Sequence, residues 1–280
     1  MAYIIPPAAV ELTPSPVPRG RFLDIAPQWG EGVRWYADGV TWEPFDFGSL
    51  HATGTDACSP AAHGATPRTC LAYETAVPFA LEDAWTSNAL ATLDDSDGDV
   101  GVQRDRWELL RSAAFAHELI TGAAAGGRAL SSDATAPALL PFGSAAVSGP
   151  TAIAVFEAHL ATVLQGGRGV IHVPPVMLPS LMEVINQVGD HWETPTGHIV
   201  IADAGYQGAV PPDGQAAASS TQAWMYASGP VMWAYAPGIG GDVRVDITTN
   251  EVTAQMTGYG ILLWDQEPVT AVLASIIPGA

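Results

Sequence analysis

The chain has 280 residues, and 48% of them are hydrophobic, which is enough to bury the core of one large domain or two small ones. Asp and Glu total 29 against ten Arg and no Lys, so the formal net charge is −19. A field of that sign repels phosphates, which argues against sequence-specific nucleic-acid binding and against association with anionic membranes.

The N-terminal segment is predicted to be an extended arm. Five prolines between Pro6 and Pro18 exclude helix and sheet over residues 1 to about 20, and Ile4 and Ile5 would become ordered only on another surface. The segment lacks the basic region and continuous apolar core of a signal peptide, and no run in the chain is long enough to span a membrane. We therefore expect a chain that is made in the cytoplasm.

The next segment, residues 29 to 47, is dense in aromatic residues and turn formers. The pair Asp38-Gly39 lies between Trp35-Tyr36 and the run from Val40 to Trp42, which is a strong hairpin signal. This pattern predicts a protruding two-stranded element.

Two cysteines, Cys58 and Cys70, enclose a segment of turn formers that follows this hairpin. A disulfide between them would close a loop and contribute about 3 kcal/mol in the chain-entropy model. Cytosolic synthesis favours two free thiols instead, and both states are kept open. The nearby pair His51 and His63 lacks the spacing of a metal site.

A strand followed by a long helix is predicted next. Residues 71 to 81 read as a strand, and residues 82 to 93 turn toward helix. The long helix is expected to begin at Asp99 as N-cap and to end at Gly122, with apolar residues at helical spacing. These are Trp107, Leu110 and Ala114, and the same helix carries the charged residues Arg104, Arg106 and Glu108.

The sequence GGRGVIHVPP, residues 166 to 175, has no lysine and has its glycines after a helix, so it is not a phosphate-binding loop. We interpret it as a helix stop followed by a buried strand over residues 170 to 174. The helix before it should begin at Ser148 and Pro150, with one apolar face consisting of Ile153, Phe156, Leu160, Val163 and Leu164.

The remaining elements are predicted in order from residue 178. We expect a third helix over 178–189, a strand over 198–203, and a hairpin over 223–235 that turns at Ser228-Gly229. Residues 242–268 should form two strands joined near Thr249-Asn250.

No pattern for catalysis, a metal or a cofactor is found. Asp95, Asp97 and Asp99 match the start of a calcium loop, but Val100 replaces the required glycine and Arg106 the required glutamate. No Gly-x-Ser-x-Gly elbow accompanies the histidines, and His172 is expected to be a buried structural residue. Nine tryptophans with many carboxylates leave a carbohydrate-active hydrolase as an alternative of a different class. We expect that the chain is not an enzyme and binds no cofactor.

The order of elements resembles the major capsid proteins of tailed bacteriophages, whose Hong Kong 97-type fold encapsulin shells share. The segment DRWELLRSAAFAHELITGAAAGG is similar to the spine helix of that family. Residues 151–181 look like its axial-domain helix, strand and next helix, and residues 223–235 resemble its axial-domain hairpin. The segment NEVTAQMTGYGILLWDQEPVTAVL is similar to its late peripheral strand.

The resemblance implies an α+β fold of five parts: an N-terminal arm, an extended β-hairpin loop, a peripheral domain with the long spine helix, an axial domain, and strands that return to the peripheral domain. In this chain they correspond to residues 1–28, 29–75, 76–147, 148–240 and 241–280.

The implied function is that of a major capsid protein that self-assembles, as hexamers and pentamers, into the icosahedral head shell around a phage genome. The expected location is the virion, after synthesis in the bacterial host, and further partners would be portal, scaffold and decoration or cement proteins. An encapsulin-like nanocompartment shell protein is the alternative with the same fold. The expected inter-subunit contacts are Ile4, Ile5, Trp35, Tyr36, Trp42, Arg104, Arg106 and Glu108.

The chain departs from the namesake phage in one respect. Subunits of that phage are joined covalently through lysine and asparagine side chains, and this chain has no lysine. Shell strength would therefore come from noncovalent burial, metal, disulfides or a cement protein.

Overall fold

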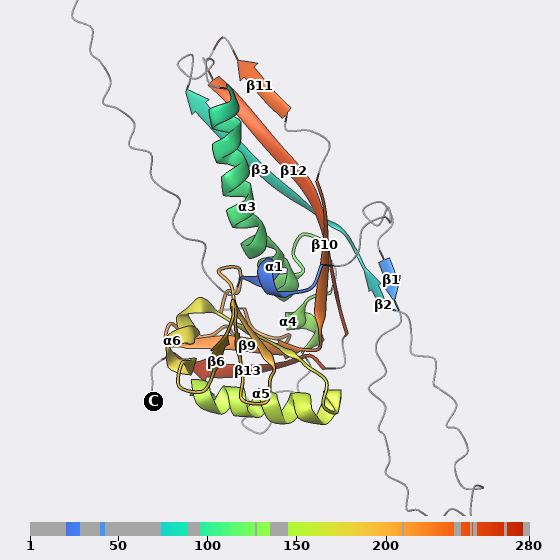
Figure 1. Ribbon diagram of the computed structural model, residues 1–280, viewed down its shortest axis with the longest axis vertical. Coiled ribbons are helices and arrows are strands. Elements are labelled where there is room, and N and C mark those ends of the chain that lie inside the picture. The colour runs from blue at the N-terminus through green and yellow to red at the C-terminus, as the bar shows by residue number, and fades with distance from the viewer. Residues whose placement is uncertain are drawn as a thin grey trace, which may run out of the picture.

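The computed structural model describes residues 21–28, 40–42, 74–88, 96–126, 128–134, 145–208, 210–237, 242–246, 248, 251–265 and 268–276. Two sheets organise this part of the chain (Figure 1). A long, narrow four-stranded sheet with a long helix beside it extends away from a broader seven-stranded sheet, and a second helix lies beneath the broader sheet.

The four-stranded sheet is built around β12, Glu251–Trp264. Strand β3, Phe79–Asn88, pairs with residues 251–260 of β12. The strands β10, Val231–Pro237, and β11, Asp242–Asp246, pair with residues 258–264 and 251–255. Since both overlap the stretch that β3 occupies, β10 and β11 lie end to end on the opposite edge of β12. All of these pairs are antiparallel.

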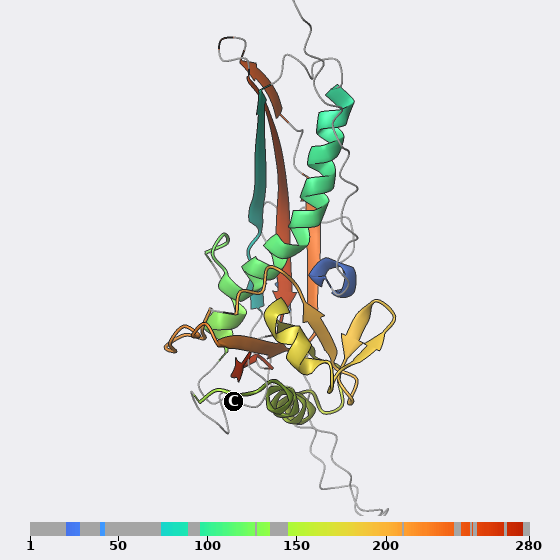
Figure 2. The ribbon, with the colours of Figure 1, turned by 90° about the vertical axis from the view of Figure 1, so that its left-hand side faces the viewer.

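The long helix α3, Ser96–Thr121, runs along one face of this sheet (Figure 2). Its 26 residues correspond to a length of about 39 Å at the usual rise per residue. The helix ends where Gly122 adopts a positive φ of 58°, which confirms the predicted stop. Its start differs from the prediction, because the helix already begins at Ser96 and Asp99 lies inside it.

The seven-stranded sheet has the order β4-β13-β9-β5-β8-β7-β6. Its strands are β4, Val147–Ser148; β13, Thr270–Ser275; β9, Gln222–Ser228; β5, Val170–Val173; β8, Ile199–Ala202; β7, His191–Glu193; and β6, Asn186–Val188. The β5–β8 and β13–β4 pairs are parallel, and the other pairs are antiparallel. Helix α5, Gly149–Leu164, packs against β13 and β9.

Alternation along the central strands gives this sheet two apolar faces. Ile171, Val173 and Met225 belong to the core that contains α5, whereas Val170 and Trp224 belong to the core shared with α3 and the four-stranded sheet. All four residues of β5 are buried, as predicted for a strand that enters a central sheet. The second core therefore joins the two sheets.

Helix α5 forms as its sequence predicts. The side chain of Ser148 accepts a hydrogen bond from the backbone N–H of Thr151, and a proline follows in the first turn. The buried face contains Ile153, Phe156, Leu160 and Leu164, while the neighbouring Val163 is only half-buried. Gln165 and Gly166 then adopt positive φ angles and end the helix.

Four shorter helical elements complete the described part of the fold. They are α1, Phe22–Ile25; α4, Leu130–Asp133; the 3-10 helix η2, Pro175–Met177; and α6, Leu178–Leu181. A separate two-stranded pair consists of β1, Val40–Trp42, and β2, Glu74–Ala76.

Three sequence predictions were wrong. Residues 82–88 belong to strand β3, because they pair with β12 instead of turning toward helix. The third predicted helix ends at Leu181, and the Gly189-Asp190 turn joins β6 to β7 as a hairpin. The expected hairpin over 223–235 does not form, because β13 and β5 occupy both edges of β9 while β10 pairs with β12.

The strand predicted over 198–203 is confirmed as β8. The two strands predicted within 242–268 are confirmed as β11 and β12, which pair antiparallel. The boundary expected at residue 240, between the axial domain and the returning strands of the peripheral domain, stays a prediction. The two sheets do not divide the chain at that position. Strand β10, before that position, lies in the four-stranded sheet, and β13, after it, lies in the seven-stranded sheet.

Candidate assembly surface

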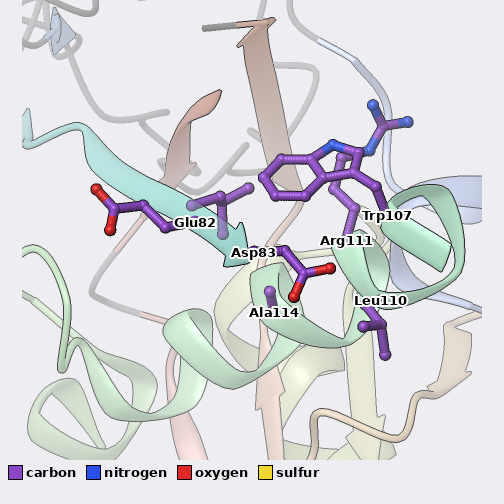
Figure 3. Close-up of a pocket in the computed structure, with 7 residues that line it drawn as sticks. Glu82, Asp83, Trp107, Leu110, Arg111 and Ala114 are labelled. Carbon is purple, nitrogen blue, oxygen red and sulfur yellow. The ribbon is translucent and has the colours of Figure 1, made fainter. Parts of the chain in front are cut away.

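A small pocket lies in the seam between strand β3 and helix α3 (Figure 3). Its volume is about 100 Å³. Figure 3 shows that Asp83 points toward the helix whereas Glu82 points away from it. The lining residues are Leu81, Glu82, Asp83, Trp107, Leu110, Arg111 and Ala114.

Local sequence explains why these side chains meet. Trp107, Leu110, Arg111 and Ala114 recur at helical spacing and so share one face of α3. Trp107 is buried, but the side chain of Leu110 is 48% exposed at the rim. Leu110 therefore presents a large apolar side chain to solvent at the rim of the pocket.

A polar cluster holds the base of the seam together. The indole Nε1 of Trp107 donates a hydrogen bond to the Tyr235 hydroxyl at 3.1 Å. The guanidinium of Arg111 lies over the Tyr235 ring, 4.6 Å from its centroid, and forms an ion pair of 2.7 Å with Glu108. The ring of Tyr235 therefore links β10 to the helix through two different interactions.

Two glycines of β12 make room for the aromatic side chains at this level. A Cβ added at Gly258 would lie 2.6 Å from the Tyr235 ring, and one at Gly260 would lie 2.5 Å from Phe79 Cζ and 2.6 Å from Phe115 Cζ. Phe79 and Phe115 pack edge to face, with ring centroids 5.1 Å apart. The two glycines of the Gly-Tyr-Gly stretch are thus required by close packing, Gly258 against β10 and Gly260 against β3 and α3.

The structure places only some of the predicted contact residues. Arg106 and Glu108 are exposed on α3 beside the pocket, and Arg106 pairs with Asp83 at 3.5 Å. The side chains of Arg104 and Trp42 lie outside the described part, although Arg104 is in α3 and Trp42 in β1. Also outside the described residues are Ile4, Ile5, Trp35, Tyr36, Cys58 and Cys70.

Other residues of the seam escaped the sequence analysis. Asp83 was missed because its segment, residues 82–93, was predicted to turn toward helix, although Phe79, Leu81, Asp83 and Trp85 alternate as a strand would require. Leu81 belonged to the strand predicted over 71–81 but was not predicted as a contact residue. Tyr235 could not have been connected to α3 from the sequence, because its partners are more than a hundred residues away.

Arginine side chains in the described part are neutralised by carboxylates. Each of the five arginines with a described side chain forms an ion pair with Asp or Glu: Arg21, Arg106, Arg111, Arg128 and Arg168. The formal charge of −19 is therefore not offset by a cluster of unpaired arginines among these five. This arrangement disfavours phosphate binding by the described surface.

His172 and Ser228 form a buried polar chain. The Ser228 hydroxyl donates to the carbonyl of Gly229 at 2.9 Å and accepts from His172 Nε2 at 2.9 Å. Nδ1 of His172 then accepts from the Tyr206 hydroxyl at 2.8 Å. Burial lowers the pKa of His172 to about 3, and burial together with the charge of Asp203 raises the pKa of Tyr206 well above its ordinary value.

This network contains a serine hydrogen-bonded to a histidine, as in a catalytic serine and its base, but neither side chain is accessible to a substrate. Ser228 is fully buried, and His172 is 1% exposed. The network joins strands β5 and β9 to the loop after β8, so its contribution is structural, as predicted for His172. Within the described residues, no group of three or more His, Cys, Asp or Glu side chains is arranged to hold a metal ion. No described helix is both long and apolar enough to cross a membrane.

Comparison with known proteins identifies the fold. No family model matches the sequence, and no curated protein matches it. The chain is similar to the capsid of an empty GTA particle, with 16% identity, a TM-score of 0.59, and 97% of this chain and 95% of that chain covered.

Two further solved structures agree with this match. A chain of Mycobacterium phage Ogopogo has 11% identity and a TM-score of 0.56, with 98% of this chain and 100% of that chain covered. The capsid of Ralstonia phage GP4 has 11% identity and a TM-score of 0.51, with 100% and 98% covered. The chain therefore has the mixed α and β fold of phage capsid structures, which confirms at the level of fold the resemblance seen in the sequence.

Proposed function

We propose that the protein is a major capsid protein, which self-assembles into the icosahedral head shell of a tailed bacteriophage and encloses its DNA genome. The observation that carries this proposal is the extent of the likeness, because both sheets and the long helix correspond to a whole capsid chain. A carbohydrate-active hydrolase is not supported by any comparable feature. The protein would act through its surfaces and not through catalysis.

The five parts expected from the sequence fit this function. The pair of β1 and β2 is suited to the base of the extended hairpin loop, since the chain leaves it after Trp42 and returns at Glu74. Helix α3 with the four-stranded sheet would be the peripheral domain, and the seven-stranded sheet with α5 the axial domain. In this proposal β13 belongs to the axial domain and β10 to the peripheral domain.

Charge and composition support a role as a container. A protein of net charge −19 does not adhere to the DNA that it encloses, which leaves the packaged genome mobile. Because the chain has no lysine, subunits would not be joined by lysine–asparagine cross-links, and their contacts would be made by the arm, the loop and exposed residues such as Leu110 and Arg106. Hexamers, pentamers, and a portal, scaffold or cement protein are the partners that the proposal implies.

The proposal is tested by expressing the full chain alone and recording negative-stain electron micrographs beside size-exclusion chromatography. We expect closed particles, rings or sheets. A 29.1 kDa monomer at every concentration and ionic strength would contradict the proposal. A co-purifying cargo peptide inside the particles would favour the nanocompartment alternative instead.

A further inference from the structure

Residues 21–28, here called the clip, lie where the two sheets meet. The clip contains the single-turn helix α1, which packs against α3 and β8. Phe22 is fully buried in the core that also contains Phe115 and Trp233. In sequence, the clip is the last part of the predicted arm, residues 1–28, and it separates the proline-rich residues 1–20 from the predicted hairpin loop, which begins at residue 29.

One end of the clip is held by a buried carboxylate. Asp203, in the loop after β8, is 2% exposed, and its Oδ2 accepts hydrogen bonds from the backbone N–H of Phe22 at 2.9 Å and from Ser112 Oγ at 2.7 Å. Ser112 Oγ in turn accepts from the N–H of Leu23 at 3.2 Å. The first backbone donors of α1 are therefore satisfied by the β8 loop and by α3.

The other end of the clip is held by strand β10. The indole Nε1 of Trp233 donates to the carbonyl of Ala26 at 2.8 Å, and the backbone N–H of Trp233 donates to the carbonyl of Pro27 at 3.2 Å. Gln28 forms a parallel bridge with Trp233. One residue of the four-stranded sheet thus fixes the point where the chain continues toward the loop.

The position of Asp203 is itself fixed by a close backbone approach. Its Oδ1 accepts from the N–H of Gly205 at 2.9 Å. A Cβ at Gly205 would collide with the carbonyl oxygen of Ala113 and would lie 2.7 Å from the backbone N of His117. The turn after β8 can therefore press against α3 only with glycine at this position, and this contact brings Asp203 to Ser112.

A carboxylate in the core is costly unless its oxygens are well supplied with donors. Here the donors come from three separate parts of the chain: the clip, helix α3, and the turn after β8. A side chain that served only to close its own turn would need no more than the Gly205 bond. The bonds to Phe22 and Ser112 serve the clip.

We propose that Asp203 is a positioning residue that anchors the clip and so sets the point from which both the arm and the loop leave the folded domain. The inference rests on the proposed function, because the arm and the loop are the segments expected to reach neighbouring subunits. Its consequence is that one buried carboxylate controls two assembly elements at once. Loss of this anchor would leave a folded domain whose arm and loop start from an unfixed position.

The test compares Asp203→Asn with Asp133→Asn as a matched control. Asp133 is also a buried aspartate, at 4% exposure, but its described side-chain partners Arg128 and Trp264 lie outside the clip. Both variants are measured by hydrogen exchange at individual backbone amides and by negative-stain microscopy of assembly products. Ser112→Ala is a second variant that removes the acceptor of Leu23 and one hydrogen-bond donor of Asp203, but keeps the carboxylate and its bond to Phe22.

We expect exchange at the Phe22 and Leu23 amides to be faster by about tenfold or more in Asp203→Asn, because hydrogen bonds to charged groups are among the stronger ones. The Asp133→Asn protein should keep wild-type exchange at both amides. At equal loss of global stability, Asp203→Asn should form malformed or open assemblies while Asp133→Asn forms closed ones. Ser112→Ala should accelerate exchange at Leu23.

Two results would overturn the inference. Wild-type exchange at Phe22 in Asp203→Asn, together with wild-type exchange at Leu23 in Ser112→Ala, would show that the clip is held by other contacts. Equal assembly defects in Asp203→Asn and Asp133→Asn at equal stability would reduce Asp203 to a structural residue. If the wild-type chain forms no shells at all, the proposed function fails, and the exchange data alone then decide whether Asp203 anchors the clip.

Discussion

Acidification from pH 7 to pH 5 should destabilise the fold through His172. This side chain is buried and both of its ring nitrogens are hydrogen-bonded, and the bond that Nδ1 accepts requires the neutral imidazole. Nδ1 accepts from Tyr206, so a proton on Nδ1 would replace an acceptor by a second donor facing the hydroxyl.

The direction follows from the two pKa values. The pKa of His172 falls from an ordinary 6.5 to about 3 in the folded chain. Between these values the unfolded chain binds the proton and the folded chain does not, so stability is full above the unfolded value and is lost as the pH falls toward about 3. Burial also lowers the pKa of His198 and of His159, which adds loss in the same direction.

Titration of His172 alone should lower the free energy of unfolding by about 2 kcal/mol between pH 7 and pH 5. Little is lost at pH 7, where the unfolded histidine is mostly neutral, and most of the loss accumulates below pH 6. Carboxylates do not mask the effect, because the lowered pKa values of Glu157 and Glu193 act below pH 5.

The assay is guanidinium denaturation of the unassembled chain at pH 7 and pH 5, followed by tryptophan fluorescence, for the wild type and for His172→Gln. Glutamine keeps one donor and one acceptor but does not titrate. The wild type should lose about 2 kcal/mol more than the variant over this pH interval. An equal loss in both proteins would refute the reasoning, because His172 would then not be the titrating group.

Further predictions concern packing and assembly. Gly260→Ala should lower the free energy of unfolding by about 1 to 3 kcal/mol, measured by the same denaturation, because its Cβ would overlap Phe79 and Phe115. Unchanged stability would mean that the rings move aside freely. Leu110→Glu should change stability by less than about 0.5 kcal/mol because the side chain is half exposed, yet reduce particle formation in micrographs; normal particle yield would remove Leu110 from the assembly surface. Deletion of residues 1–20 should leave the circular dichroism spectrum of a folded core but abolish closed shells, and unchanged particles would contradict the role of the arm.

The sequence predicted best the elements that are marked by local signals. Ser148 with a following proline, and Gly166 after an apolar face, fixed both ends of α5 because capping depends on a few adjacent residues. The buried strand β5 was equally clear, because its four residues, three of which are apolar, lie between Gly169 and two prolines. The apolar face predicted for α3 was correct only in part: Trp107 is buried, but Leu110 is half exposed, and the core residues of this helix are Phe115, Ala116, Leu119 and Ile120.

The partner of each strand could not be predicted in the same way. The run from Ala223 to Tyr235 looks like a hairpin because two apolar stretches flank Ser228-Gly229, but pairing is decided by distant strands that compete for each edge. The base of the seam was missed for the same reason, since Tyr235 and Gly258 come from far beyond α3 in sequence. The anchoring role of Asp203 likewise depends on a contact across 181 residues.

The separation of β9 and β10 into different sheets has a mechanical consequence. The chain crosses between the sheets at Gly229 and again near Pro268, and these two crossings touch, since a Cβ at Gly229 would lie 3.2 Å from Pro268 Cγ. The outer end of β12 and the inner end of β10 lie at opposite ends of their antiparallel pair, which spans Val231–Pro237. A pull between these two ends would load the hydrogen bonds of the pair together and not one after another. Because β12 also continues along its own backbone into β13, the narrow sheet is tied to the broad sheet by two routes, and it would resist stretching along its strands more strongly than peeling of β10 from its edge.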